Sequence, residues 1–177
     1  MELIHGGLAK YTSINGIKVG VASSDELPGT VEVMVFEEDT NLVLTVEKEL
    51  KYQDKHPIHL MTDIMNTKGH KPGSLVINKN SWYAVVIDVD ADTMCKAAWI
   101  SEAYREMFAC LEKKEVRSAG MHLLGSTYGG IPINQAAAFF LKELSSSKVS
   151  CLRNIWLIVQ HREIKNVQRE LNRNSTR

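Results

Sequence analysis

The sequence contains little that would hold a fold together by covalent or metal bonds. Its 177 residues include three cysteines, Cys95, Cys110 and Cys151, whose odd number and wide spacing match neither a disulfide framework nor a cysteine metal motif. Unpaired thiols are typical of a reducing compartment, so we expect a cytoplasmic protein. No stretch reaches the roughly 18 apolar residues that a membrane span needs, and the N-terminus lacks a signal-peptide pattern. We therefore expect no membrane association.

Net charge is also absent, because 21 basic residues balance 21 acidic ones. Nucleic-acid binding normally requires a basic surface, so nucleic acid is not an expected partner. A chain of this length buries enough apolar surface to fold as one domain. We predict a single domain over 1–177, with added N-terminal strands in 1–50 and a C-terminal helix with a frayed tail in 160–177.

Short apolar runs separated by turn residues predict strands in the first half. These runs are "IKVGVA" (17–22), "VEVMVF" (31–36) and "NLVLTV" (41–46), with "LPGT" and "EEDT" as turns between them. The stretch "HLMTDIM" (59–65) fits either a strand or a short helix.

Strands and helices alternate in the second half of the sequence. Strands are predicted at "SLVI", "WYAVVIDV", "AGMHLLG" and "NIWLIV", and a final helix over 161–172. Two further helices follow from apolar residues spaced by three and four: Ala97, Ile100, Tyr104, Met107 and Leu111 in one, and Ala137, Phe140, Leu141 and Leu144 in the other. This order predicts an α/β fold with a mixed, largely parallel sheet between layers of helices.

The stretch "LLGSTYGGIP" (123–132) is the most informative candidate site. It leaves a predicted strand and enters a predicted helix, which is where open parallel sheets bind ligands. Gly125, Gly129 and Gly130 allow the backbone N–H groups to face an anion, and Ser126 and Thr127 add hydroxyl donors. The glycine spacing matches neither common phosphate-loop motif. The stretch is thus either a phosphate cradle or a glycine-rich turn.

Other polar clusters are weaker candidates. "DVDADT" (88–93) lacks the glycine and glutamate of a calcium loop, so we interpret it as a strand end, with Asp88 and Asp90 placed to line a pocket at the same sheet edge. His122 precedes the glycine loop and is interpreted as a hydrogen-bonded core residue, with an acid–base group as the alternative. "HPIH" has no further ligand nearby, so we expect no metal and no cofactor.

The segment from "PGSLVI" to "VQREL" resembles the macro domain, a three-layer α/β/α module whose members bind ADP-ribose. "LLGSTYGGIP" looks like the diphosphate-and-ribose loop of that family. The resemblance implies that Gly125–Thr127 and Gly129–Gly130 donate backbone hydrogen bonds to a diphosphate and that Tyr128 lies against the distal ribose. The family's asparagine-rich stretch and second glycine loop have no match in residues 1–72. The N-terminal portion of leucyl aminopeptidases has a similar fold and serves assembly.

Three functions follow as hypotheses. The first is a module that binds ADP-ribose or a related nucleotide diphosphate, with a homo-oligomer as a further expected partner state. The second is an ADP-ribosyl or phosphoester hydrolase that uses the same crevice, with Asp88, Asp90 or His122 as the acid–base group. The third is a non-catalytic structural or interaction domain that has lost ligand binding. No catalytic motif is matched, so the sequence favours a binding module over an enzyme.

Overall fold

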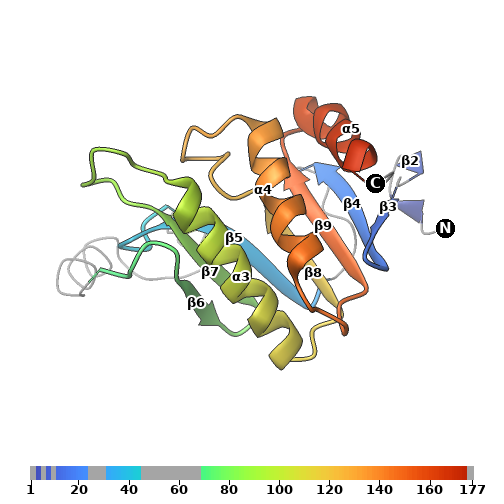
Figure 1. The fold of residues 1–177 in the computed structure, drawn as a ribbon, viewed down its shortest axis with the longest axis horizontal. Helices are drawn as coiled ribbons and strands as arrows, with labels where there is room; N and C mark the ends of the chain where they lie inside the picture. The colour runs from blue at the N-terminus through green and yellow to red at the C-terminus, as the bar shows by residue number, and fades with distance from the viewer. Residues whose placement is uncertain (1–2, 5–6, 9–10, 24–30, 45–68, 175–177) are drawn as a thin grey trace, which may run out of the picture.

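A computed structural model describes residues 3–4, 7–8, 11–23, 31–44 and 69–174 of the chain. Its centre is a seven-stranded sheet with the strand order β3-β4-β9-β8-β5-β7-β6 (Figure 1). The strands of this sheet are β3 (Tyr11–Ile14), β4 (Ile17–Ser23), β5 (Val33–Asp39), β6 (Leu75–Asn78), β7 (Ser81–Ile87), β8 (Ser118–His122) and β9 (Asn154–Val159). Two short strands, β1 (Leu3–Ile4) and β2 (Gly7–Leu8), pair with each other outside it.

The five inner strands of the large sheet are parallel, and each of the two outermost strands runs antiparallel to its neighbour. Strands β4, β9, β8, β5 and β7 run in one direction. A tight turn through Asn15 and Gly16, both with positive φ, joins β3 to β4 at one edge, and β6 pairs antiparallel with β7 at the other. The mixed, largely parallel α/β sheet predicted from the sequence is therefore confirmed. The carboxyl ends of all five inner strands lie on the same side of the sheet, which we call its carboxyl edge.

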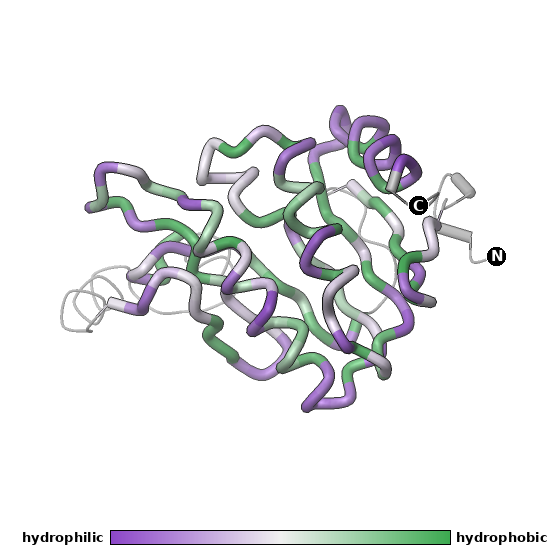
Figure 2. The backbone as a smooth tube through the Cα atoms, in the orientation of Figure 1, coloured by the Kyte–Doolittle hydropathy of each residue, from purple (hydrophilic) through white to green (hydrophobic). Residues whose placement is uncertain are grey.

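Helices α3 (Ala97–Lys113) and α4 (Ile133–Ser146) lie side by side on one face of the sheet (Figure 1). A 3-10 turn, η1 (His161–Glu163), leads into α5 (Ile164–Asn174), which packs against α4 and β4. The predicted stripe of α3 is buried at Ile100, Tyr104, Met107 and Leu111, whereas Ala97 is exposed at the helix start. Figure 2 shows hydrophobic residues concentrated in the inner strands and hydrophilic residues dominating α5. Within the described segments, no helix is long and apolar enough to cross a membrane.

One predicted strand is wrong in its described part. Residues 41–44 of "NLVLTV" form a turn after β5, with Leu42 at a φ of 57°. The turn forms because two carboxylates bind its backbone: Asp39 Oδ1 accepts from Asn41 N at 2.6 Å, and Glu38 Oε2 accepts from Leu44 N at 3.1 Å. Local side-chain acceptors of this kind compete with a strand's ladder. Residues 45–46 and the "HLMTDIM" stretch lie outside the described residues.

Candidate ligand site

The candidate site lies at the edge of the sheet where the inner strands end. The turn after β5, the loop 88–96 after β7 and the glycine loop 123–132 after β8 all leave the sheet there (Figure 1). Parallel strand order brings these segments together although they are far apart in sequence, and the carboxyl edge is the usual ligand position of such sheets.

Glu37 is the central residue of this edge. It lies near the end of β5, between β7 and β8, and shares a sheet face with Val33 and Val35 because strand side chains alternate. Only 2% of its surface is exposed. A carboxylate at such a position is costly unless hydrogen bonds compensate it.

Four backbone N–H groups of the glycine loop compensate the Glu37 carboxylate. Gly125 N and Thr127 N donate to Oε2 at 2.9 and 3.3 Å. Tyr128 N and Gly129 N donate to Oε1 at 2.9 and 3.0 Å. The loop is therefore an anion cradle, and the anion within it belongs to the chain itself.

Two further backbone donors of the loop are also paired. Leu124 N donates to the Tyr104 hydroxyl at 3.1 Å, and Ser126 N donates to the carbonyl of Leu123 at 3.1 Å. Together with the four bonds to Glu37, every N–H from Leu124 to Gly129 has an acceptor within the protein. A ligand that used the same donors would have to displace Glu37.

Burial and hydrogen bonding act in opposite directions on the Glu37 carboxyl. Burial raises its pKa, since the charged form loses hydration, and the four N–H bonds lower it. Burial is the larger effect, so the pKa lies above its ordinary value. The buried Cys95 thiol has its pKa raised to about 11, first by burial and then by the charge of Glu37.

Two glycines of the loop are required by packing. A Cβ at Gly125, whose φ is +84°, would lie 2.6 Å from Ile100 Cδ1. A Cβ at Gly129 would lie 2.8 Å from both Cys95 Sγ and the carbonyl oxygen of Gly125. Gly130 is favoured by its backbone conformation and not by packing. Its φ of +69° suits glycine, and no atom lies within 4 Å of an added Cβ.

An open crevice of about 340 Å³ adjoins the loop on the side of β9. His122, Ser126 and Thr127 line one wall. The segment from the end of β9 into η1 contributes further lining residues, which are Ile158, Val159, Gln160, Arg162 and Glu163. This volume is within the range of small-molecule sites, and its walls combine apolar side chains with both signs of charge.

The other predicted site residues are distributed unevenly around this edge. Asp88 Oδ1 accepts a bond from Asp90 N at 3.1 Å in the loop after β7, and neither residue lines the crevice. His122 does line it, and its ring lies 5.8 Å from that of Phe36. Tyr128 is 41% exposed.

The sequence reasoning missed Glu37, because "EEDT" was interpreted as a turn between strands. A signal was present: three acidic residues, Glu37, Glu38 and Asp39, continue an apolar strand without an intervening turn residue. All three are buried, and each accepts a backbone N–H group from the glycine loop or from the turn after β5. Consecutive acids at the carboxyl end of a buried strand indicate acceptors for such donors.

Comparison with solved structures shows that this is the fold of the macrodomains. A variant of the Oceanobacillus iheyensis macrodomain with ADPR matches with a TM-score of 0.71 and 16% identity, over 96% of this chain and 100% of that chain. The macro domain of ganglioside induced differentiation associated protein 2 matches with a TM-score of 0.63 and 15% identity, over 89% of this chain and 83% of that one.

A third similar structure is the Trypanosoma brucei macrodomain in complex with ADP, at a TM-score of 0.62 and 14% identity, over 86% of this chain and 68% of that chain. No protein-family model and no curated protein matches the sequence. Similarity at these identities supports the three-layer α/β fold alone. Function is therefore inferred from the geometry of the loop and the crevice.

Proposed function

We propose that this chain is a non-catalytic module that binds ADP-ribose or a related nucleotide diphosphate, with Glu37 as an internal competitor for the diphosphate cradle. The observation that carries the proposal is the convergence of four loop N–H groups on one carboxylate. Donors arranged for a carboxylate of the chain are also arranged for a phosphate oxygen. Macrodomains of the same fold have been solved with ADP and with ADP-ribose.

The crevice supports this proposal. Ser126 and Thr127 belong both to the cradle loop and to the crevice wall, so a ligand seated in the crevice extends directly to the loop. A diphosphate would enter the cradle once the Glu37 side chain leaves it. Binding therefore includes the cost of moving a hydrogen-bonded carboxylate, and the affinity of the unaltered chain is low.

Calorimetric titration of ADP-ribose into the wild type, Glu37→Ala and Glu102→Ala tests the proposal. Glu102 is a matched control, because its carboxylate is half exposed on α3 and pairs with Lys71. We expect Glu37→Ala to bind at least about ten-fold more tightly than the wild type, which corresponds to the loss of one charge-assisted competitor, and Glu102→Ala to match the wild type. A folded Glu37→Ala chain that gives no heat at millimolar ADP-ribose would contradict the proposal.

The closed loop favours a second candidate function, a structural or interaction domain that no longer uses the cradle for a ligand. In that case the Glu37 carboxylate occupies the cradle permanently. Under this alternative, Glu37→Ala loses stability and no nucleotide restores it. Thermal unfolding of Glu37→Ala with and without ADP-ribose separates the two functions.

A further inference from the structure

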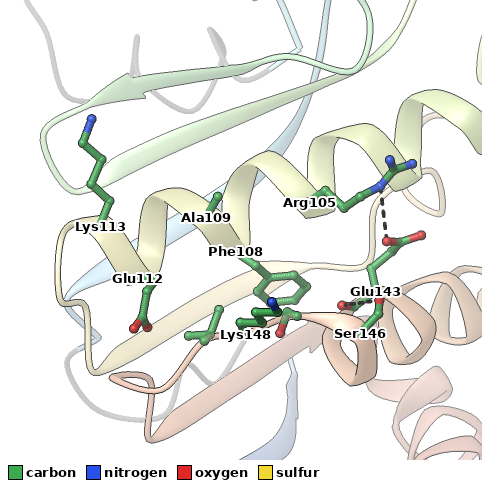
Figure 3. A pocket seen from close by; sticks show the side chains of 10 residues that line it. Arg105, Phe108, Ala109, Glu112, Lys113, Glu143, Ser146 and Lys148 are labelled. Carbon is green, nitrogen blue, oxygen red and sulfur yellow. Dashed lines mark hydrogen bonds and ion pairs between the residues drawn. The ribbon is translucent and has the colours of Figure 1, made fainter.

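A further cavity, of about 560 Å³, lies between α3, α4 and the segment that follows α4 (Figure 3). None of its lining residues belongs to the glycine loop or to the crevice beside it. It is therefore separate from the nucleotide site proposed above.

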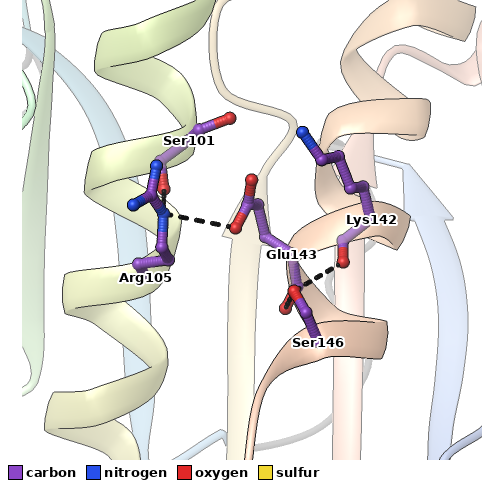
Figure 4. A network of polar contacts seen from close by, with 5 residues as sticks. All are labelled: Ser101, Arg105, Lys142, Glu143 and Ser146. Atoms are coloured by element: carbon purple, nitrogen blue, oxygen red, sulfur yellow. Dashed lines mark hydrogen bonds and ion pairs between the residues drawn. The ribbon is translucent and has the colours of Figure 1, made fainter.

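Two polar connections hold the ends of this cavity. At one end Arg105 Nε on α3 lies 3.4 Å from Glu143 Oε2 on α4 and donates to the carbonyl of Ser101 at 3.2 Å (Figure 4). At the other end Glu112 accepts from Ser150 N at 2.8 Å and from Cys151 N at 3.1 Å. The hydrogen bonds from Ser150 and Cys151 lower the pKa of Glu112 to about 2. Both ends of the cavity are thus bridged by contacts within the protein.

The floor of the cavity is aromatic. Phe108 is 2% exposed, and its ring lies 6.1 Å from Tyr104 and 6.3 Å from Phe140, measured between centroids. Packing against two rings holds Phe108 in one position. Ala109 and Val149 add apolar lining nearer to solvent. The interior therefore suits an apolar body.

The charge available to a ligand is positive. Arg105, Lys113 and Lys148 line the cavity against Glu112 and Glu143. Both acids already have partners, as described above, whereas Lys148 makes no hydrogen bond or ion pair to any residue in the described part of the chain. Figure 3 shows Lys148 beside Phe108, while Lys113 points away. An anionic group on an apolar body would complement this arrangement.

We propose that this cavity binds a small amphipathic anion: an aromatic or aliphatic body lying against Ala109 and Val149 over the buried Phe108 ring, with a single carboxylate or sulfonate facing Lys148. The cavity volume is typical of small-molecule sites. The Lys148 stem packs along the apolar body while its ammonium group reaches the anion.

Fluorescence titration with anilinonaphthalene sulfonate, an aromatic anion that brightens in apolar surroundings, tests this proposal on the whole chain. We expect a saturable signal that decanoate displaces and decylamine does not. Lys148→Glu is expected to weaken binding about five-fold or more. Lys165→Glu, a matched charge reversal at an exposed position of α5, is expected to leave it unchanged.

A second pair of variants tests the location. Ala109→Trp fills the cavity from an exposed helical position and is expected to abolish the saturable signal, whereas Ala98→Trp, also exposed on α3 but outside the cavity, retains it. Circular dichroism verifies that both variants fold. The proposal is overturned by an absent wild-type signal, by a folded Ala109→Trp that binds as the wild type does, or by equal displacement with decylamine.

Discussion

The Oε1 atom of Glu37 lies 2.9 Å from the backbone nitrogen of Tyr128, which is 91 residues further along the chain. This contact joins the central strand β5 to the glycine loop after β8, and three further N–H groups of that loop bind the same carboxylate. The loop combines the two interpretations of its sequence. Its backbone N–H groups are arranged to bind an anion, and the carboxylate of Glu37 already occupies that position.

Removing the carboxylate is expected to destabilise the fold. Glu37→Ala leaves four loop N–H groups without their acceptor, and we expect the free energy of unfolding to fall by about 2 kcal/mol, the scale of hydrogen bonds to a charged group. Chemical denaturation measures this change, with Glu102→Ala as the exposed control. An unfolding free energy equal to that of the control would show that the four bonds contribute nothing net.

Small anions are expected to restore part of that stability. Formate or acetate that enters the vacated cradle binds only the folded Glu37→Ala chain, so a concentration of ten times Kd stabilises it by about 1.4 kcal/mol. Thermal unfolding in formate, compared with chloride at equal ionic strength, measures the effect. The wild type is expected to show no difference between the two salts, and an equal shift in both proteins would contradict occupation of the cradle.

The stability of the protein is expected to depend on pH through Glu37. Its folded-state pKa is raised above the ordinary value of 4.5, so the folded chain holds this proton more tightly than the unfolded chain. The contribution of this group is therefore most favourable below 4.5 and declines as pH rises through the raised pKa. The unfolding free energy of the wild type, minus that of Glu37→Gln, should fall over this interval. A rising difference would mean that the four N–H bonds outweigh burial.

Two neighbouring glycines are expected to respond to alanine for different reasons. Gly129→Ala places a Cβ against Cys95 and the carbonyl of Gly125, so we expect a loss of about 1–3 kcal/mol through overpacking. Gly130→Ala meets no neighbouring atom and is expected to cost about 1 kcal/mol through its positive φ alone. Denaturation of both variants gives the comparison. A larger loss for Gly130→Ala would contradict the packing of the loop against Cys95.

Much of the fold followed from the sequence because hydrophobic periodicity reflects burial directly. The continuous apolar run "WYAVVIDV" predicted a strand, and every residue from Trp82 to Ile87 is buried in strand β7. The prediction failed at 41–44, where the apolar run "NLVL" continues the pattern but the carboxylates of Glu38 and Asp39 bind its backbone. Hydrophobic periodicity contains no information about side-chain acceptors of this kind.

The candidate site was predicted only in part, since its two halves come from distant segments. The glycine loop was identified from its residue types and its place between strand and helix. Its partner, Glu37, became visible only when the strand order placed β5 beside β8. The run of acids at 37–39 indicates acceptors and the glycine loop indicates donors, but the sequence alone does not show that these two segments are adjacent.

The occupation of the cradle by Glu37 is tested most directly by following the backbone amide resonances of the loop by NMR as pH is varied. We predict that the amides of Gly125, Thr127, Tyr128 and Gly129 shift together with one midpoint above 4.5, that the Glu37 carboxyl carbon shares this midpoint, and that Glu37→Gln abolishes the shift. Four amides that titrate independently, or that titrate unchanged in Glu37→Gln, would contradict the account.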